Sequence, residues 1–265
     1  MPTTALNTAA SGMYAQQVNI EVISNNIANV NTTGFKKNKA QFQDLMYQEV
    51  EINPQTTSTP GIDETSPNTI LVGTGVQNSS TSKIFKQGDI VNTNNQLDLA
   101  IQGDGFFQIQ KPDGTYVYTR DGSFQTNADG NITTADGLLL DPGLTLDDKI
   151  TGLSIGRDGT VEAQQNDGSK FVLGNIELVR FINPAGLKPL GDNLYAATDA
   201  AGTPILGTPG QDGFGDIRQG YLESSNVDIV EEMIAMIAAQ RAYEMNSKTV
   251  QTVQQMMTVA NNLQG

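Results

Sequence analysis

The residues best suited to chemistry in this sequence are aspartates, because the 265 residues include no histidine and no cysteine. The chain therefore lacks the commonest general base, the best thiol nucleophile and the usual transition-metal ligands. Two well-placed carboxylates are nevertheless enough for glycoside hydrolysis. Eight aspartates, each followed by glycine, are the candidates: Asp104, Asp113, Asp121, Asp129, Asp136, Asp158, Asp167 and Asp212.

The spacing of these Asp-Gly pairs favours turns over catalysis. Asp-Gly is a preferred dipeptide of tight β-hairpin turns. The first four intervals between the pairs are seven to nine residues long, which fits short strands joined by turns. We therefore expect no catalytic residue among them.

No metal, nucleotide or cofactor site is predicted either. The stretch closest to a calcium-binding loop, Asn127 to Gly130, lacks the earlier acidic positions and the terminal glutamate of an EF-hand. Gly73-Thr74-Gly75 and Gly103-Asp104-Gly105 do not continue into a dinucleotide or P-loop motif.

Strand-forming residues between the turns predict a central all-β domain. Phe106 to Ile109, Tyr116 to Thr119 and Phe171 to Leu173 are rich in aromatic and β-branched residues. Short strands separated by glycine-rich corners are typical of a barrel or a sandwich, and the sequence leaves both open.

Two long amphipathic helices are predicted at the ends of the chain. Apolar residues recur in steps of seven between Leu6 and Val30 and again between Ser225 and Leu263, with Ser225 as the N-cap of the second helix. A long helix with an apolar face exposed to water is not stable on its own, so we expect the two helices to pair as one coiled-coil layer. The predicted seam consists of Leu6, Met13, Ile20, Ile23, Ile27, Val30, Ile229, Met236, Tyr243, Val250 and Met257.

These elements predict an α+β fold in four segments. Residues 1–45 form the N-terminal helix and a turn, residues 46–69 an extended segment, residues 70–220 the β domain, and residues 221–265 the C-terminal helix. The second segment contains Pro54 and Pro67 around a polar stretch, which is typical of extended or loop structure. Phe42, Leu45 and Met46 are expected in a short helix or turn.

The formal charge of −14 is concentrated in residues 46–220, which carry ten basic and twenty-two acidic side chains. A field of this sign repels phosphate, so neither nucleic acid nor an anionic membrane is an expected partner. No basic n-region precedes an apolar h-region, and no window approaches eighteen apolar residues. We therefore expect neither a cleaved signal peptide nor a membrane span.

Several stretches of the sequence resemble a known set of motifs. They are Ser24 to Asn29 followed by Thr33 to Lys36, then Gly103 to Phe107, Tyr118 to Phe124, Gly220 to Val227, and Gln240 to Lys248. In composition and order they resemble the signature of the bacterial flagellar rod and hook family. The residues that carry the terminal motifs are Asn25, Asn26, Asn29, Gly34, Phe35, Gln240, Arg241 and Tyr243.

The resemblance implies a structural, self-assembling subunit and not an enzyme. In this family the terminal helices are expected to line a helical tube, with the β domain as its outer layer. The length and centre of the chain are most similar to distal rod proteins, whose tube transmits torque and conducts exported subunits. Residues 46–69 would then be a rod-specific segment that stiffens the tube.

The resemblance also implies partners and a location. The chain would form a homopolymer and meet proximal rod proteins, the hook, and the ring proteins of the periplasm and outer membrane. It would leave the cell through the flagellar type III export machine, without a cleaved signal peptide. Its place would be the basal body of the flagellum, crossing the periplasm.

Two alternatives stay open on the sequence. One is a proximal rod protein of the same family, which residues 46–69 make less favoured. The other is a secreted β-rich binding module or carbohydrate-active enzyme with a helical oligomerisation stalk. A concave acidic pocket with a pair of carboxylates of raised pKa would favour the latter.

Overall fold

A computed structural model describes residues 2–51, 69–146, 150–166 and 169–262. The chain divides into two compact units. Unit 1 comprises residues 1–25, 38–82 and 230–265, and unit 2 comprises residues 26–37 and 83–229. Each unit is described by itself.

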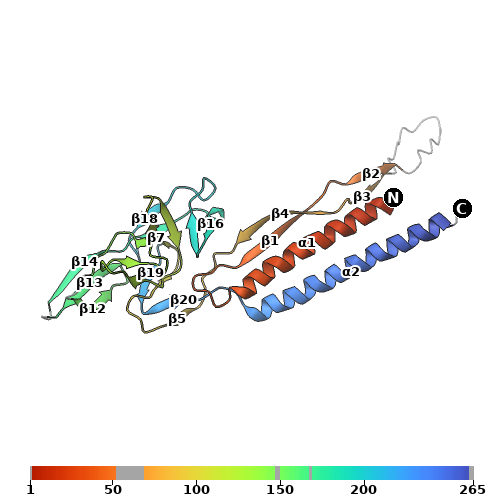
Figure 1. Cartoon of the computed structure of the whole chain (residues 1–265). Helices are drawn as coiled ribbons and strands as arrows, with labels where there is room; N and C mark the ends of the chain where they lie inside the picture. The colour runs from red at the N-terminus through yellow and green to blue at the C-terminus, as the bar shows by residue number, and fades with distance from the viewer. Residues whose placement is uncertain (1, 52–68, 147–149, 167–168, 263–265) are drawn as a thin grey trace, which may run out of the picture. The chain divides into compact units, whose positions relative to one another are not determined.

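Unit 1 contains two long helices and a pair of β-ribbons. Helix α1 spans Pro2–Ala28, its last three residues belonging to unit 2, and α2 spans Ile229–Asn262. The two helices lie side by side (Figure 1). Strand β1 (Asn38–Asp44) pairs with β4 (Val76–Lys83), and β2 (Gln48–Glu51) pairs with β3 (Thr69–Val72).

Small residues and short polar side chains on α1 allow close packing on two sides. The Ser11 hydroxyl accepts a hydrogen bond from the Val76 backbone N–H at 3.2 Å, which ties α1 to β4. On its other side Gly12 faces α2, where a Cβ atom at this glycine would lie only 2.9 Å from Asn246 Nδ2. Helix α1 is therefore the middle layer of unit 1.

The boundaries of several predicted elements were wrong. Phe42 lies in strand β1, not in a helix or turn, because this segment pairs with β4, a partner too distant in sequence to show in a local pattern. Helix α2 begins at Ile229, so Ser225 is not its N-cap; the Ser225 hydroxyl instead accepts from the Val227 N–H at 3.3 Å. Of the predicted extended segment, residues 52–68 lie outside the described residues, and the flanking strands β2 and β3 form an antiparallel ribbon.

Unit 2 is built almost entirely of antiparallel strands. The largest sheet has nine strands in the order β16-β17-β8-β7-β11-β10-β9, with β15 pairing with β7 and β18. A three-stranded sheet, β12-β13-β14, and the pairs β19-β6 and β20-β5 complete it. The bounds are β5 Ile90–Asn92, β6 Leu99–Gln102, β7 Phe106–Gln110, β8 Tyr116–Thr119, β9 Gln125–Thr126, β10 Ile132–Thr133, β11 Leu139–Leu140, β12 Ile150–Ile155, β13 Thr160–Gln165, β14 Lys170–Asn175, β15 Leu178–Arg180, β16 Lys188–Gly191, β17 Leu194–Ala196, β18 Ile205–Gly207, β19 Asp216–Gln219 and β20 Tyr221–Glu223, with a 3-10 turn at Pro184–Gly186.

The core of unit 2 lies on both faces of β7. Phe107 and Ile109 point into the larger cluster, and Phe106 points into a second cluster with Phe181 and Tyr195. Successive residues of a strand point to opposite faces, so a strand buried on both sides reads as a continuous apolar run. Phe106 and Phe107 of β7 begin this apolar run.

The predicted Asp-Gly turns are confirmed at four hairpins. Gly114, Gly130, Gly137 and Gly159 each have a positive φ, between 78° and 83°, at the turns β7–β8, β9–β10, β10–β11 and β12–β13. Glycine adopts this conformation at no steric cost. The pair at Asp167 lies outside the described residues.

Candidate functional site: a helical assembly surface

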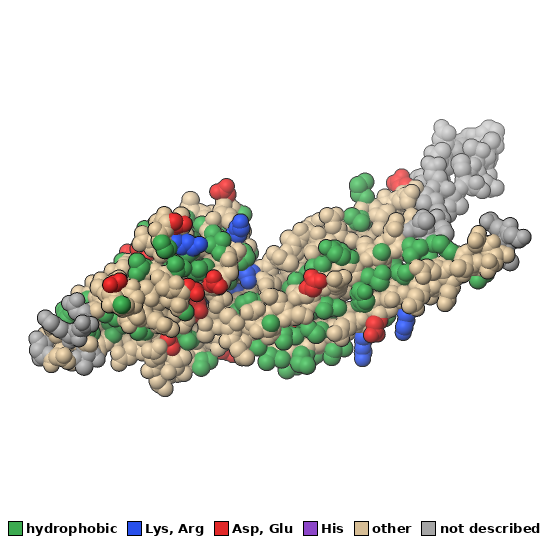
Figure 2. Space-filling view, in the orientation of Figure 1, with side chains coloured by type: hydrophobic (Ala, Val, Ile, Leu, Met, Phe, Trp, Pro, Cys, Tyr) green, Lys and Arg blue, Asp and Glu red, His purple; other side chains and the backbone are tan. Residues whose placement is uncertain are grey.

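An apolar surface of unit 1 lies along the first turns of α2. Val230, Met233, Ile234 and Ile237 are 66%, 54%, 64% and 49% exposed. Their spacing places them on one side of the helix, and Figure 2 shows hydrophobic side chains gathered along this part of the molecule. We call these four residues the α2 stripe. Further along α2, Met245, Met256 and Val259 are also exposed.

A different face of α2 is packed within unit 1. Its buried residues are Glu232, Ala239 and Val253. Asn246, which approaches Gly12 of α1, falls in the same series of sevens. The sequence-based seam was placed three residues earlier, because Glu232 and Asn246 are polar and do not contribute to an apolar repeat.

The predicted seam residues are buried to different extents. On α1, Ile23 is buried, while Leu6, Met13, Ile20 and Ile27 are half-buried. On α2, Met236, Val250 and Met257 are half-buried, but Ile229 and Tyr243 are exposed. Val30 follows the end of α1 at Ala28, so its place on a helical seam is wrong.

The motif residues fall into two groups. Asn25 accepts a hydrogen bond from Asn38 Nδ2 at 3.3 Å within unit 1, and Gln240 and Arg241 are exposed on α2. In unit 2, Asn26 and Phe35 are buried, and Asn29 accepts a hydrogen bond from the Thr32 hydroxyl at 3.2 Å. Gly34 has φ of 65°, and its N–H donates to the Glu223 backbone carbonyl at 2.8 Å.

Three motif stretches of unit 2 meet at a buried ion cluster, which the sequence-based reasoning missed. Glu223 Oε1 lies 2.6 Å from Lys36 Nζ, and Glu223 Oε2 lies 3.3 Å from an Arg120 guanidinium nitrogen. The Lys36 and Glu223 side chains are fully buried, and that of Arg120 is nearly so. The only sequence signal was that each residue stands within or beside a separate family motif.

Burial and charge pairing have opposite effects on the pKa values of the two basic residues in this cluster. Burial lowers the pKa of Lys36, and the nearby Glu223 carboxylate opposes that shift. Burial likewise lowers the pKa of Arg120, whose guanidinium lies 5.4 Å from the centre of the Phe106 ring. Because removing one partner leaves a buried charge without compensation, breaking such a cluster costs about 3–5 kcal/mol. The cluster thus supports the fold of unit 2.

The carboxylates of two turn aspartates accept hydrogen bonds from residues of the same turn. The Asp113 carboxylate accepts from the Thr115 N–H at 2.9 Å and from the Thr115 hydroxyl at 2.6 Å, and these bonds lower the pKa of Asp113. Asp158 and Thr160 repeat the arrangement, with the same effect on the pKa of Asp158. Both groups therefore stabilise turns as carboxylates.

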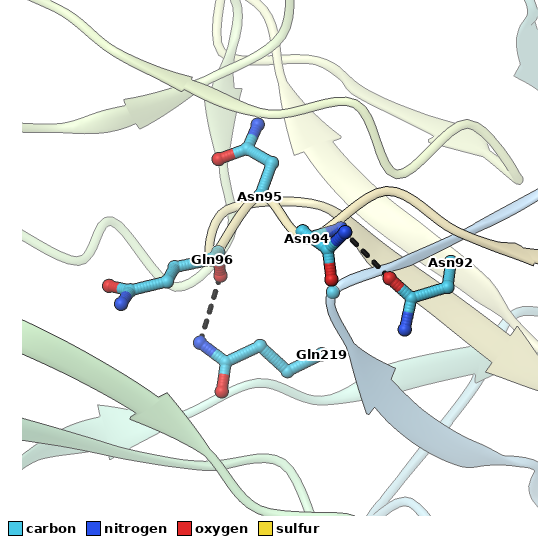
Figure 3. A pocket seen from close by; sticks show the side chains of 6 residues that line it. Asn92, Asn94, Asn95, Gln96 and Gln219 are labelled. Carbon is cyan, nitrogen blue, oxygen red and sulfur yellow. Dashed lines mark hydrogen bonds between the residues drawn. The ribbon is translucent and has the colours of Figure 1, made fainter.

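A pocket of unit 2 is lined by neutral amides (Figure 3). Its volume is about 240 Å³, and its lining residues are Asn92, Asn94, Asn95, Gln96, Gln219 and Gly220. Gln219 Nε2 donates to the carbonyls of Gln96 and Leu153, both at 2.9 Å, and Gln219 Oε1 accepts from the Ile155 N–H at 3.0 Å. The Gln219 side chain therefore joins three segments of unit 2. No carboxylate lines this pocket, which does not favour the carbohydrate-active alternative.

The described residues also bear on metal binding and on membrane spanning. Among them, no group of three or more aspartates, glutamates, histidines or cysteines is arranged to hold a metal ion. Neither α1 nor α2, as far as each is described, is long and apolar enough to cross a membrane.

Models of flagellar protein families match three parts of the chain. The match to "Flagella basal body rod protein" covers residues 6–36. That to "Flagellar hook protein FlgE/F/G D1 domain" covers residues 100–163, and that to "Flagellar basal body rod FlgEFG protein C-terminal" covers residues 218–263.

Individual relatives match nearly the whole chain. The flagellar basal-body rod proteins FlgG of Caulobacter vibrioides and of Borreliella burgdorferi are each 47% identical to it, over 98% of both chains. The chain belongs to the flagellar rod and hook family. The FlgG of Bacillus subtilis is 36% identical, again over 98% of both chains. The crystal structure of the Helicobacter pylori flagellar hook protein FlgE2 aligns at 16% identity over 71% of this chain and 43% of that chain, and its TM-score of 0.24 is too low to support an argument.

The regions that match the family models coincide with the stretches joined by the buried ion cluster. The three family matches contain Lys36, Arg120 and Glu223 respectively, so the buried ion cluster joins all three matched regions. The predicted resemblance is confirmed, and within the family the chain is similar to FlgG proteins. It is a structural subunit of the flagellar distal rod.

Proposed function

We propose that α1 and α2 drive self-assembly of the rod by pairing as a coiled-coil layer with each other and with the helices of neighbouring copies. The observation that carries this proposal is the α2 stripe, an apolar surface on a helix whose other side is already packed within unit 1. Soluble proteins seldom leave such a surface uncovered unless it is an interaction site.

The α2 stripe suits a helical partner. Its residues follow the i, i+3, i+4, i+7 pattern with which one amphipathic helix binds another. Burial of apolar surface contributes about 25 cal/mol per Å². Repetition of a head-to-tail contact that does not close on itself produces a filament. By the resemblance to distal rod proteins, this filament would be a helical tube that transmits torque and conducts exported subunits.

The proposal extends to partners and location. As a flagellar protein, the chain would reach the basal body through the type III export machine, without a cleaved signal peptide, and cross the periplasm there. Its partners would be proximal rod proteins, the hook, and the ring proteins of the periplasm and outer membrane. The four-segment division at residues 45, 69 and 220 also stays a proposal, with residues 46–69 stiffening the rod.

Labelling of a single introduced cysteine tests the proposed interface, because the 265-residue sequence has no cysteine. In Ile234→Cys, a maleimide reagent should label the thiol rapidly in dilute monomer and much more slowly in assembled samples, because the proposed contact covers this side chain. The matched control is Val172→Cys on β14 of unit 2, which is 63% exposed against 64% for Ile234. The control should be labelled at the same rate in both samples. Equally rapid labelling of Ile234→Cys in monomer and in assemblies would show that the α2 stripe is not the contact.

A further inference from the structure

The chain passes between the two units four times, after residues 25, 37, 82 and 229. Unit 2 is therefore formed from one short segment, residues 26–37, and one long segment, residues 83–229. Three of its chain ends lie near Lys37, Lys83 and Ile229.

Glu223 joins two of these ends through its side chain. Its Oε1 atom accepts hydrogen bonds from Lys36 Nζ at 2.6 Å and from the Gly88 N–H at 2.9 Å. Lys36 Nζ also donates to the Lys86 carbonyl at 2.9 Å. One buried carboxylate thus connects the segment before residue 37 to the segment after residue 83, and its own backbone leads toward residue 229.

Asn226, three residues after Glu223, joins the same segments with its amide. Its Oδ1 atom accepts from the Lys37 N–H at 2.8 Å, and its Nδ2 atom donates to the carbonyls of Ile84 and Lys86 at 2.8 and 3.0 Å. The Ile84 N–H in turn donates to the Lys37 carbonyl at 2.9 Å. These three hydrogen bonds of the Asn226 amide therefore connect the three chain ends.

We propose that Glu223 and Asn226 form a clamp that makes these three chain ends of unit 2 open and close as one cooperative element. The clamp rests on two side chains with separate partners, one charged and one neutral. Because the bonds are shared among three segments, loss of either side chain loosens amides to which that side chain is not bonded. The inference depends only on contacts within unit 2, so it stands apart from the proposed helical interface.

Hydrogen exchange of the full chain at low concentration tests the clamp. In Glu223→Gln, the amides of Lys37 and Ile84, which have no bond to Glu223, should exchange at least tenfold faster, as should those of Gly34 and Gly88. In Asn226→Ala, the amides of Gly34 and Gly88 should in turn exchange faster by a similar factor, although Asn226 has no bond to them.

The reference amides are those of β13, in the three-stranded sheet of unit 2, which should accelerate by a smaller factor than the amides of the three chain ends. The matched control is Glu177→Gln, the same substitution at an exposed position. Acceleration limited to the amides bonded to the replaced side chain would overturn the proposal, because the ends would then be held independently. Equal acceleration in β13 would overturn it as well, because unit 2 would then open as a whole. Should Glu223→Gln fail to fold, Asn226→Ala is judged by the same criteria.

Discussion

Replacing Ile234 of the α2 stripe by serine should weaken assembly without weakening the fold. Ile234 is 64% exposed, so about two thirds of the side chain remains to be buried in a contact between copies. Complete burial of an isoleucine side chain stabilises by about 1.5–3 kcal/mol, so the loss per subunit should be about 1–2 kcal/mol. Since 1.4 kcal/mol is a tenfold change in an equilibrium constant, the critical concentration for assembly should rise about 5- to 30-fold.

The assay is a pelleting titration that measures the concentration of protein left in solution at equilibrium with assemblies. Serine and isoleucine have similar helix propensities, so α2 itself should be unaffected. Thermal unfolding of the dilute monomer should stay within about 0.5 kcal/mol of the parent protein, as is usual for a surface substitution.

The control for this titration is Val172→Ser, which removes an equally exposed apolar side chain from β14 in unit 2. Its critical concentration should match that of the parent protein. If Ile234→Ser also assembles at the parent concentration, the α2 stripe is not buried on assembly and the reasoning fails.

Three further predictions concern substitutions at single residues. Gly34→Ala should cost at least about 2 kcal/mol in urea unfolding, because φ is 65° and the added Cβ would lie 2.7 Å from the Asp121 backbone nitrogen; parent-like stability would contradict this. Gly12→Leu should lower the melting temperature of the helical circular dichroism signal, because a Cβ there already comes within 2.9 Å of Asn246 Nδ2, and a raised melting temperature would show that the helices have room to spare. Burial raises the pKa of Tyr195 from 10.0 to about 12, so the folded state keeps a proton that the unfolded state releases, and this stabilisation is lost as pH rises from 10 to 12. The parent protein should lose about 1.4 kcal/mol relative to Tyr195→Phe between pH 9 and pH 11, and equal pH profiles would exclude the effect.

The sequence predicted the elements whose signal is local. Heptad spacing predicted both helices, and Asp-Gly pairs predicted four hairpin turns, because each signal lies within one element or one turn. The stretch Phe106 to Ile109 likewise predicted a strand, because its aromatic and β-branched residues lie within that one strand.

The features that depend on distant partners could not be predicted. Strand β1 is fixed by pairing with β4, and the local residues around Phe42 carry no strong strand pattern. The ion cluster brings Lys36, Arg120 and Glu223 together from three separate stretches, and their motifs did not reveal that they meet. On α2 the face packed within unit 1 includes the polar residues Glu232 and Asn246, so hydrophobicity alone did not indicate this face.

The central claim is that the apolar surfaces of α1 and α2 are buried between copies when the rod assembles. The most direct test is far-UV circular dichroism combined with sedimentation velocity on the full chain over a wide range of concentrations. Burial of the α2 stripe between copies should add to the stability of the helices, so helix content should be lower in the dilute monomer and rise together with the appearance of large assemblies. A compact monomer with full helix content at every concentration would contradict the claim.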